Sequence, residues 1–81
     1  MIHARPDYNR IQDPENKIPT DEPVCLFRGH DPCVPTLLRI YAILAWKAGC
    51  NSDVIHSINT HAEKIDQWQK DHPESVHPAN L

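Results

Sequence analysis

The sequence predicts a mainly α-helical fold, an antiparallel helical hairpin that follows an extended, proline-rich N-terminal arm. Apolar residues recur at helical spacing through most of residues 32–72, and strong helix-ending signals interrupt this pattern near Gly49. Four of the eight prolines fall within residues 1–23, where they remove backbone donors and disfavour helix. A chain of 81 residues is expected to form a single small domain, with its core in residues 24–72.

The first helix is expected over about residues 32–48. Asp31 is suited to cap it, Pro32 to begin it, and Gly49 to end it in a left-handed backbone conformation. This helix is apolar nearly all round, and Ile43 interrupts its only polar stripe. One partner helix cannot cover so much apolar surface. The N-terminal arm, the segment before the helix or another subunit must therefore cover the rest.

The second helix is expected over about residues 52–72, with Asn51 or Ser52 as its cap and Pro73 as its stop. It is amphipathic, with an apolar stripe that comprises Val54, Ile55, Ile58, Ala62, Ile65 and Trp68. We expect Ile58 of this stripe to pack in the core against Leu44 of the first helix. The tail, residues 73–81, is expected to be mobile.

The N-terminal arm, residues 1–23, is expected to be extended, with a turn at residues 12–16. A solvated, disordered arm is the alternative, because polar proline-rich segments often remain unfolded. The apolar run at residues 24–27 is typical of a short strand. A single strand leaves its backbone groups unpaired, so the arm or a second subunit must supply a partner strand.

Composition excludes several classes of partner. The formal charge of −3 provides no basic surface for duplex nucleic acid. The longest apolar run, residues 40–46, is far shorter than the roughly 20 residues that span a bilayer. The N-terminus does not resemble a signal peptide, and the three cysteines are odd in number without a CxxC motif. These features favour a reduced, cytoplasmic protein with free thiols.

Neither a metal site nor an active site is predicted. Structural zinc sites normally use closely spaced ligand pairs, and no CxxC or HxxxH spacing is present. We interpret the potential ligands as small buried cysteines and surface histidines: Cys25, Cys33 and Cys50, with His30, His56 and His61. GxSxG, Walker and HExxH motifs are missing as well. We therefore expect a non-enzymatic protein without a cofactor.

Side chains suited to binding an anion concentrate in the N-terminal half. Arginine presents forked donors to phosphate or carboxylate, and tyrosine can stack on a nucleobase. The ligand-binding residues that we predict on this basis are Arg5, Tyr8, Asn9, Arg10, Lys17 and Arg28. In the alternative interpretation, Arg5 and Arg10 pair with nearby acidic residues and pin the arm onto the helices.

Two stretches of this half, RPDYNRIQDP at 5–14 and KIPTDEPVCLFRGHD at 17–31, resemble the opening of a group of short phage and prophage proteins. The similarity is close over the N-terminal half and loose over the hairpin, and Cys25 stands where an aromatic residue is more usual. The resemblance carries over no functional residue. It implies a phage-encoded accessory protein that acts by stoichiometric binding in the cytoplasm of a bacterial host.

These observations predict a binding protein that works as a homo-oligomer, a dimer or higher, with Ile40, Ile43 and Trp46 at its interface. The first hypothesis is a counter-defence protein that sequesters a small anionic ligand, such as a nucleotide immune signal. The second is a protein–protein inhibitor of a host or defence enzyme, which would use the apolar surface of the first helix. The third is a minor structural protein of the virion.

Overall fold

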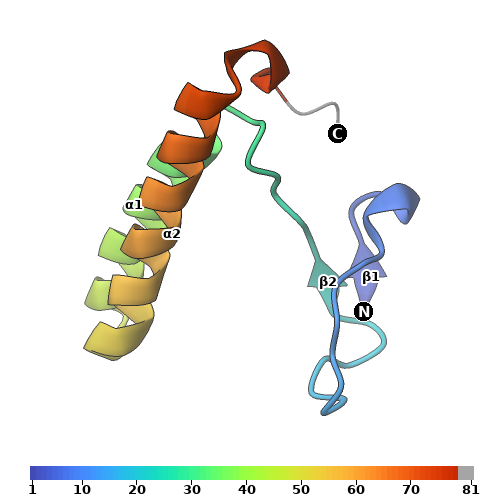
Figure 1. The fold of residues 1–81 in the computed structure, drawn as a ribbon. Coiled ribbons are helices and arrows are strands. Elements are labelled where there is room, and N and C mark those ends of the chain that lie inside the picture. The colour runs from blue at the N-terminus through green and yellow to red at the C-terminus, as the bar shows by residue number, and fades with distance from the viewer. Residues whose placement is uncertain (79–81) are drawn as a thin grey trace.

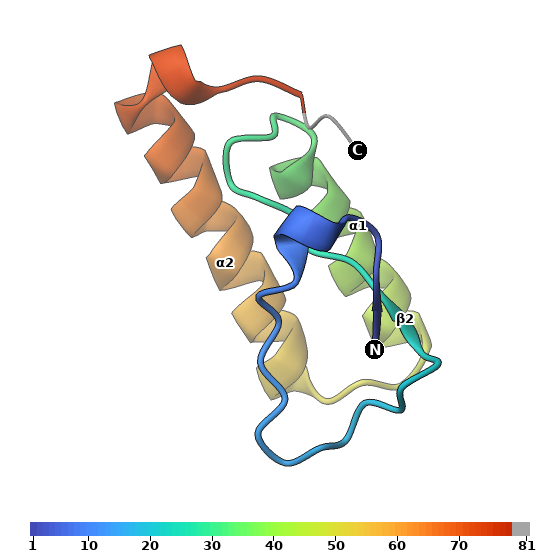
Figure 2. The same ribbon diagram turned by 90° about the vertical axis from the view of Figure 1, so that its right-hand side faces the viewer.

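The structure, a computed structural model, describes residues 1–78 of the chain. Two helices, α1 (Val34–Lys47) and α2 (Ser52–Asp71), run antiparallel and pack side by side as a hairpin (Figures 1 and 2). This confirms the predicted fold class, although α1 begins at residue 34 instead of about 32. The hairpin is the largest regular unit of the chain.

The turn before α1 explains the later start of that helix. The carboxylate of Asp31 accepts a hydrogen bond from the backbone N–H of Cys33 at 2.8 Å, and the backbone oxygen of Asp31 accepts one from Val34 at 3.1 Å. Asp31 therefore organises the turn that leads into the helix. The residue at the N-cap itself, Cys33, makes no capping hydrogen bond through its side chain.

The connection between the helices follows the sequence signals closely. Gly49 has a backbone φ of 88°, the left-handed conformation that glycine adopts without strain. The side chain of Asn51 then accepts a hydrogen bond from the N–H of Val54 at 3.0 Å, which confirms Asn51 as the cap of α2. At its other end α2 stops at Asp71, just before the proline that follows His72.

The core between the helices is small and rich in alanine. Its buried apolar residues are Val34, Ala42, Ala45, Ala62 and Ile65. Leu44, which we expected in this core, is 57% exposed, and Ile58 is only half-buried. The reason is rotational: successive residues turn by roughly 100° about a helix axis, so with Ala42 and Ala45 towards α2, Leu44 lies outside the contact.

The N-terminal arm supplies the partner strand that the apolar run requires. Strand β1 (Ile2–His3) pairs in parallel with β2 (Pro23–Val24), with Ile2 opposite Pro23 and His3 opposite Val24. The predicted strand at 24–27 is therefore too long, because only Val24 of that run joins the sheet. The backbone N–H of Ala4 donates to Val24 at 3.1 Å, and after this contact a short 3-10 helix, η1 (Pro6–Tyr8), turns the arm away.

The N-terminal half lies to one side of the hairpin. In Figure 1, the two strands and η1 stand apart from both helices, and the segment after β2 climbs to the start of α1. Local bonds hold this half together: the carboxylate of Asp13 accepts the N–H groups of Lys17 and Ile18 at 2.9 and 2.8 Å. The arm is ordered by such turns and by the sheet, and it leaves much of α1 uncovered.

The chain docks onto α2 only as it approaches α1. The side-chain amide of Gln69 donates to the carbonyl oxygens of Gly29 and Asp31, both at 2.9 Å. His30, between them, is 6% exposed, so our interpretation of it as a surface histidine was wrong. The interpretation of the three cysteines as buried was wrong too, because all three are exposed.

The segment after α2 folds back towards His30. A short 3-10 helix, η2 (Pro73–Ser75), follows α2, and the rings of His77 and His30 then stack with their centroids 4.3 Å apart. The backbone N–H of His77 also donates to the carbonyl oxygen of His30 at 3.0 Å. The mobility that we expect of the tail stays a prediction, and residues 79–81 of that tail lie outside the described residues.

Candidate ligand-binding site

The residues with anion-binding chemistry are positioned by η1. Pro6 fixes the backbone angle at the start of this turn, and the N–H of Tyr8 donates to the carbonyl oxygen of Arg5 at 3.1 Å. The turn places Arg5, Asp7 and Tyr8 within one compact loop, immediately after β1.

Within this loop, Arg5 forms a forked ion pair with Asp7. Its Nε and one terminal nitrogen donate to the two carboxylate oxygens at 2.9 and 2.5 Å. The guanidinium carbon also lies 4.6 Å from the centre of the Tyr8 ring, at cation–π distance. The hydrogen bond between the partners raises the pKa of Arg5 and lowers the pKa of Asp7. The alternative interpretation, in which an acidic neighbour engages the arginine, is right in this respect for Arg5.

A hollow of about 410 Å³ opens beside this loop. Its lining residues come from two segments that are far apart in the sequence: Asp7, Tyr8 and Arg10 from the arm, with Leu26 and Arg28 from the chain after β2. The parallel pairing of β1 with β2 is what brings the two segments together, because each continues from its strand in the same direction. Among the described residues, neither Arg10 nor Arg28 forms an ion pair.

Three of the six predicted ligand-binding residues therefore meet at this hollow: Tyr8, Arg10 and Arg28. Lys17 lies on the separate turn near Asp13 and pairs with Glu15 at 2.6 Å. Asn9 follows η1 but does not line the hollow, and Arg5 lies outside the lining but contacts two residues that belong to it, Tyr8 and Asp7.

Sequence reasoning missed two lining residues, Asp7 and Leu26. Asp7 lies inside the same RPDYNR run, and its acidic charge predicted only an ion pair with an arginine of the arm. Leu26 was assigned to the strand, whereas it lies beyond the end of β2. The residues that line the hollow are consequently of mixed character: two arginines, one aspartate, one tyrosine and one leucine.

The predicted interface residues lie on the exposed face of α1. Ile40 is 51% exposed, Ile43 is 56% exposed and Trp46 is 69% exposed. Two of them, Ile43 and Trp46, line a groove of about 550 Å³ between the helices. Ile40 lies outside that groove. These exposures are those of a single chain, so the assignment of the three residues to an interface stays a prediction.

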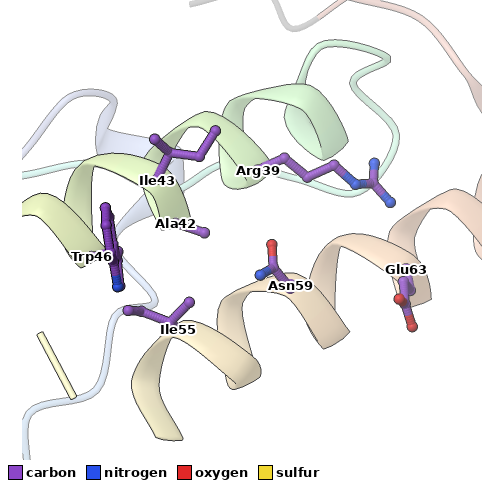
Figure 3. Close-up of a pocket in the computed structure, with 7 residues that line it drawn as sticks. All are labelled: Arg39, Ala42, Ile43, Trp46, Ile55, Asn59 and Glu63. Carbon is purple, nitrogen blue, oxygen red and sulfur yellow. The ribbon is translucent and has the colours of Figure 1, made fainter. Parts of the chain in front are cut away.

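Figure 3 shows how this groove is built. Ala42 lies between the helices, Ile43, Trp46 and Ile55 gather at one end, and Arg39 and Glu63 lie towards the other with Asn59 between. Arg39 also reaches across to Asp66 of α2, with 2.5 Å between a guanidinium nitrogen and a carboxylate oxygen. The groove thus has an apolar end and a charged end.

The remaining potential ligands do not assemble. Within residues 1–78, no group of three or more histidine, cysteine, aspartate or glutamate side chains is placed to hold a metal ion. The exposed thiols of Cys25, Cys33 and Cys50 are free. In the same part of the chain, no helix combines the length and the apolar character needed to cross a membrane.

Comparisons with known proteins add no assignment to this geometry. The chain matches no protein-family model, no curated protein and no solved structure.

Proposed function

We propose that this chain is a non-enzymatic binding protein that sequesters a small anionic ligand, such as a nucleotide signal, as a homo-oligomer. The observation that carries the proposal is the meeting of Tyr8, Arg10 and Arg28 around one hollow from two distant segments. Arg10 and Arg28 supply positive charge that no ion pair within the described residues consumes.

The composition of the hollow suits a ligand that is both anionic and aromatic. Guanidinium groups offer several parallel N–H donors to a phosphate, and a tyrosine ring stacks on a nucleobase. The volume of about 410 Å³ lies within the range of small-molecule sites. Leu26 adds apolar surface beside the phenol ring. A mononucleotide or a cyclic dinucleotide has the required mixture of charge and flat apolar surface.

The uncovered surface of α1 supports the proposal of an oligomer. Five large side chains of this helix are more than half exposed: Ile40, Tyr41, Ile43, Leu44 and Trp46. Contiguous apolar surface of this kind favours association. Because the N-terminal half stands apart from its own hairpin, it leaves α1 free for a second copy (Figure 1). A dimer or higher assembly would also bring the hollows of neighbouring chains into one particle.

The resemblance to short phage and prophage proteins supplies a setting for such binding. A phage-encoded protein that removes a nucleotide signal by stoichiometric binding would act as a counter-defence factor in the bacterial cytoplasm. This mode of action requires no catalytic residue, only affinity and abundance. The setting rests on the resemblance of the N-terminal half and on no motif of known activity.

Calorimetric titration with AMP, cyclic di-AMP and inorganic phosphate tests the proposed site. We expect saturable binding of a nucleotide, weakened at least about tenfold by Arg10→Ala, because a hydrogen bond to a charged group contributes about 1.5–3 kcal/mol. Lys17→Ala is the matched control, since it removes the same charge outside the hollow and should change affinity less than about twofold. Equal losses in both variants would mean that net charge, not the hollow, governs binding.

A second candidate function is supported by the groove on the hairpin. Its apolar end, where the exposed Trp46 gathers with Ile43 and Ile55, is suited to an apolar side chain of another protein (Figure 3). A protein–protein inhibitor of a host or defence enzyme would use this face and would need no nucleotide. If no nucleotide binds and Trp46→Ala abolishes stoichiometric capture of one purified bacterial enzyme, this function replaces the first.

A further inference from the structure

The Arg5–Asp7 pair stands beside the hollow in a way that simple anion binding does not explain. Asp7 is an acidic residue among those that line a site that we assign to anions. Arg5, the cation nearest to it, does not line the hollow and lies over the ring of Tyr8 instead. Two charged residues of the loop are thus engaged with each other and with an aromatic ring.

We propose that this pair is a positioning device that holds the Tyr8 ring as a one-sided stacking platform for the ligand. Arg5 covers one face of the ring, which leaves the other face and the ring edge for the hollow. Arg5 and Asp7 are then positioning residues, and Tyr8 is the residue that touches the ligand. The inference rests on the proposed function for the ligand, although the arrangement of the three side chains can be tested without one.

The geometry of the pair explains why it can orient a ring. Two parallel hydrogen bonds, at 2.9 and 2.5 Å, fix the plane of the guanidinium group relative to the Asp7 carboxylate. A planar guanidinium group stacks on an aromatic face, which a lysine ammonium group cannot do in the same way. The chain of contacts therefore runs from Asp7 through Arg5 to the plane of Tyr8.

Such a device suits a tyrosine in the position of Tyr8. The ring is only half-buried, and η1 is a turn of three residues. A tyrosine on a short exposed turn would otherwise sample several rotamers, and ordering it would reduce the affinity for any ligand that stacks on it. The pair orders the ring before the ligand arrives.

The pair also makes the carboxylate compatible with an anion site. The two hydrogen bonds from Arg5 keep the Asp7 carboxylate paired, and they lower the pKa of Asp7. The two charges cancel next to the hollow, and Arg10 and Arg28 are left as its uncompensated cations. The charge balance therefore favours a ligand with a small number of phosphate groups.

Asp7→Asn distinguishes a positioning role of Asp7 from a purely electrostatic one, because the two roles predict opposite changes in ligand affinity. Removal of a negative charge from the lining should tighten the binding of an anion if electrostatics alone decides. If Asp7 positions Tyr8 through Arg5, the same change should weaken the binding of cyclic di-AMP by about threefold to fivefold, the size of an exposed cation–π contact. Arg5→Lys keeps the charge, loses the fork and should show the same loss. Tyr8→Phe keeps the ring and should retain both the contact and most of the affinity.

The direct readout is the nuclear Overhauser effect between the Arg5 side-chain protons and the Tyr8 ring protons, measured without ligand. We expect it in the wild type and in Tyr8→Phe, and we expect its loss in Asp7→Asn. Asp21→Asn, which removes an exposed carboxylate outside the hollow, is the matched control. Far-ultraviolet circular dichroism should be unchanged in all variants, because the hairpin does not depend on the pair.

The outcomes are distinct. Loss of the Overhauser contact together with weaker cyclic di-AMP binding supports the inference. A contact that survives in Asp7→Asn, or a contact that is lost while affinity stays equal or rises, overturns it. If wild-type protein binds neither AMP nor cyclic di-AMP, the proposed function fails. In that case, loss of the contact in Asp7→Asn still supports the positioning of Tyr8 by Arg5 and Asp7.

Discussion

The hairpin and the N-terminal half are ordered by different kinds of contact. The hairpin has regular helices, a side-chain cap at Asn51 and an alanine-rich contact that lets the helices approach closely. The N-terminal half has two strands of two residues each and depends on local bonds, such as those that Asp13 accepts from two backbone N–H groups. Order in the first comes from packing, whereas order in the second comes from turns.

The exposed apolar surface and the candidate binding site also lie in different halves of the chain. The hairpin carries most of the exposed large apolar side chains, and the N-terminal half carries the hollow with Arg10 and Arg28, which form no ion pair within residues 1–78. Binding residues commonly lie on irregular segments that a regular scaffold supports. Here the hollow lies on the irregular half, and the bonds from Gln69 to Gly29 and Asp31 attach that half to α2.

The largest effect should come from the small core of the hairpin. Ile65 is 8% exposed, so Ile65→Ala should reduce the free energy of unfolding by about 2–4 kcal/mol. Leu44→Ala should cost less than about 1 kcal/mol in a dilute monomer, because more than half of that side chain is already exposed. Urea unfolding followed by circular dichroism measures both. Equal costs at the lowest protein concentration would contradict the helix contact described above.

The two substitutions should also differ in how their cost in unfolding free energy depends on protein concentration. If assembly covers the outer face of α1, the cost of Leu44→Ala should grow with concentration, because the substitution then also weakens association. The cost of Ile65→Ala should stay constant, since that side chain is buried within one chain.

The next effect concerns the exposed face of α1. Ile43→Glu places a charge on the exposed face of α1 and should weaken self-association at least about tenfold, about 1.4 kcal/mol. Analytical ultracentrifugation at micromolar concentration measures the loss. Ser57→Glu, on an exposed position of α2 outside the groove, introduces the same charge and should leave assembly intact. A wild-type protein that sediments as a monomer of 9.3 kDa would refute the oligomer itself.

A smaller effect is expected at the turn of the hairpin. Asn51→Ala removes the acceptor for the N–H of Val54 and should cost about 1 kcal/mol of unfolding free energy. Ser52→Ala, one residue further on, is the control, because the hydroxyl of Ser52 makes no hydrogen bond within the described part of the chain and should contribute only a few tenths. Similar losses in both variants would indicate that the capping bond does not form in solution.

The smallest effect on stability belongs to the N-terminal pair. The pKa of Asp7 is lowered by Arg5, so the ion pair is fully formed above the usual aspartate value of about 3.9 and is lost as the pH falls through the lower pKa of the folded state. Carbon-detected NMR titration should place the Asp7 midpoint below that value and return it upward in Arg5→Ala. The melting temperature should hardly change, because the pair is exposed. A midpoint at or above 3.9 would contradict the fork.

Much of the hairpin was predictable because its signals are local. Asn51 and Gly49 act through their own side chain and backbone angle, so their roles follow from the residue types. Leu44 shows the limit, because the apolar pattern of α1 runs nearly all round the helix and does not say which side faces α2. Asp66 gives a second example: its spacing from Lys70 favours a pair within α2, yet its carboxylate is bonded to Arg39 of α1.

The candidate site was predictable only as a collection of residue types. The RPDYNR run and Arg28 have side chains that are suited to bind phosphate and to stack on aromatic groups. Lys17 was predicted to join them, but it pairs with Glu15 on a separate turn. The hollow brings together Tyr8, Arg10 and Arg28 because β1 and β2 pair in parallel. This pairing joins residues about one quarter of the chain apart, which the residue types alone do not predict.

By itself, the sequence determined the two helices, the cap of α2 at Asn51, the extended arm and the charged character of the N-terminal half. These features arise from backbone preferences and hydrophobic periodicity, which act over a few residues. Only the tertiary structure decided which face of α1 stays exposed, how short β2 is and which arginine meets which partner. Those choices depend on contacts between distant segments, where small differences in packing geometry select one pairing among several that the residue types allow.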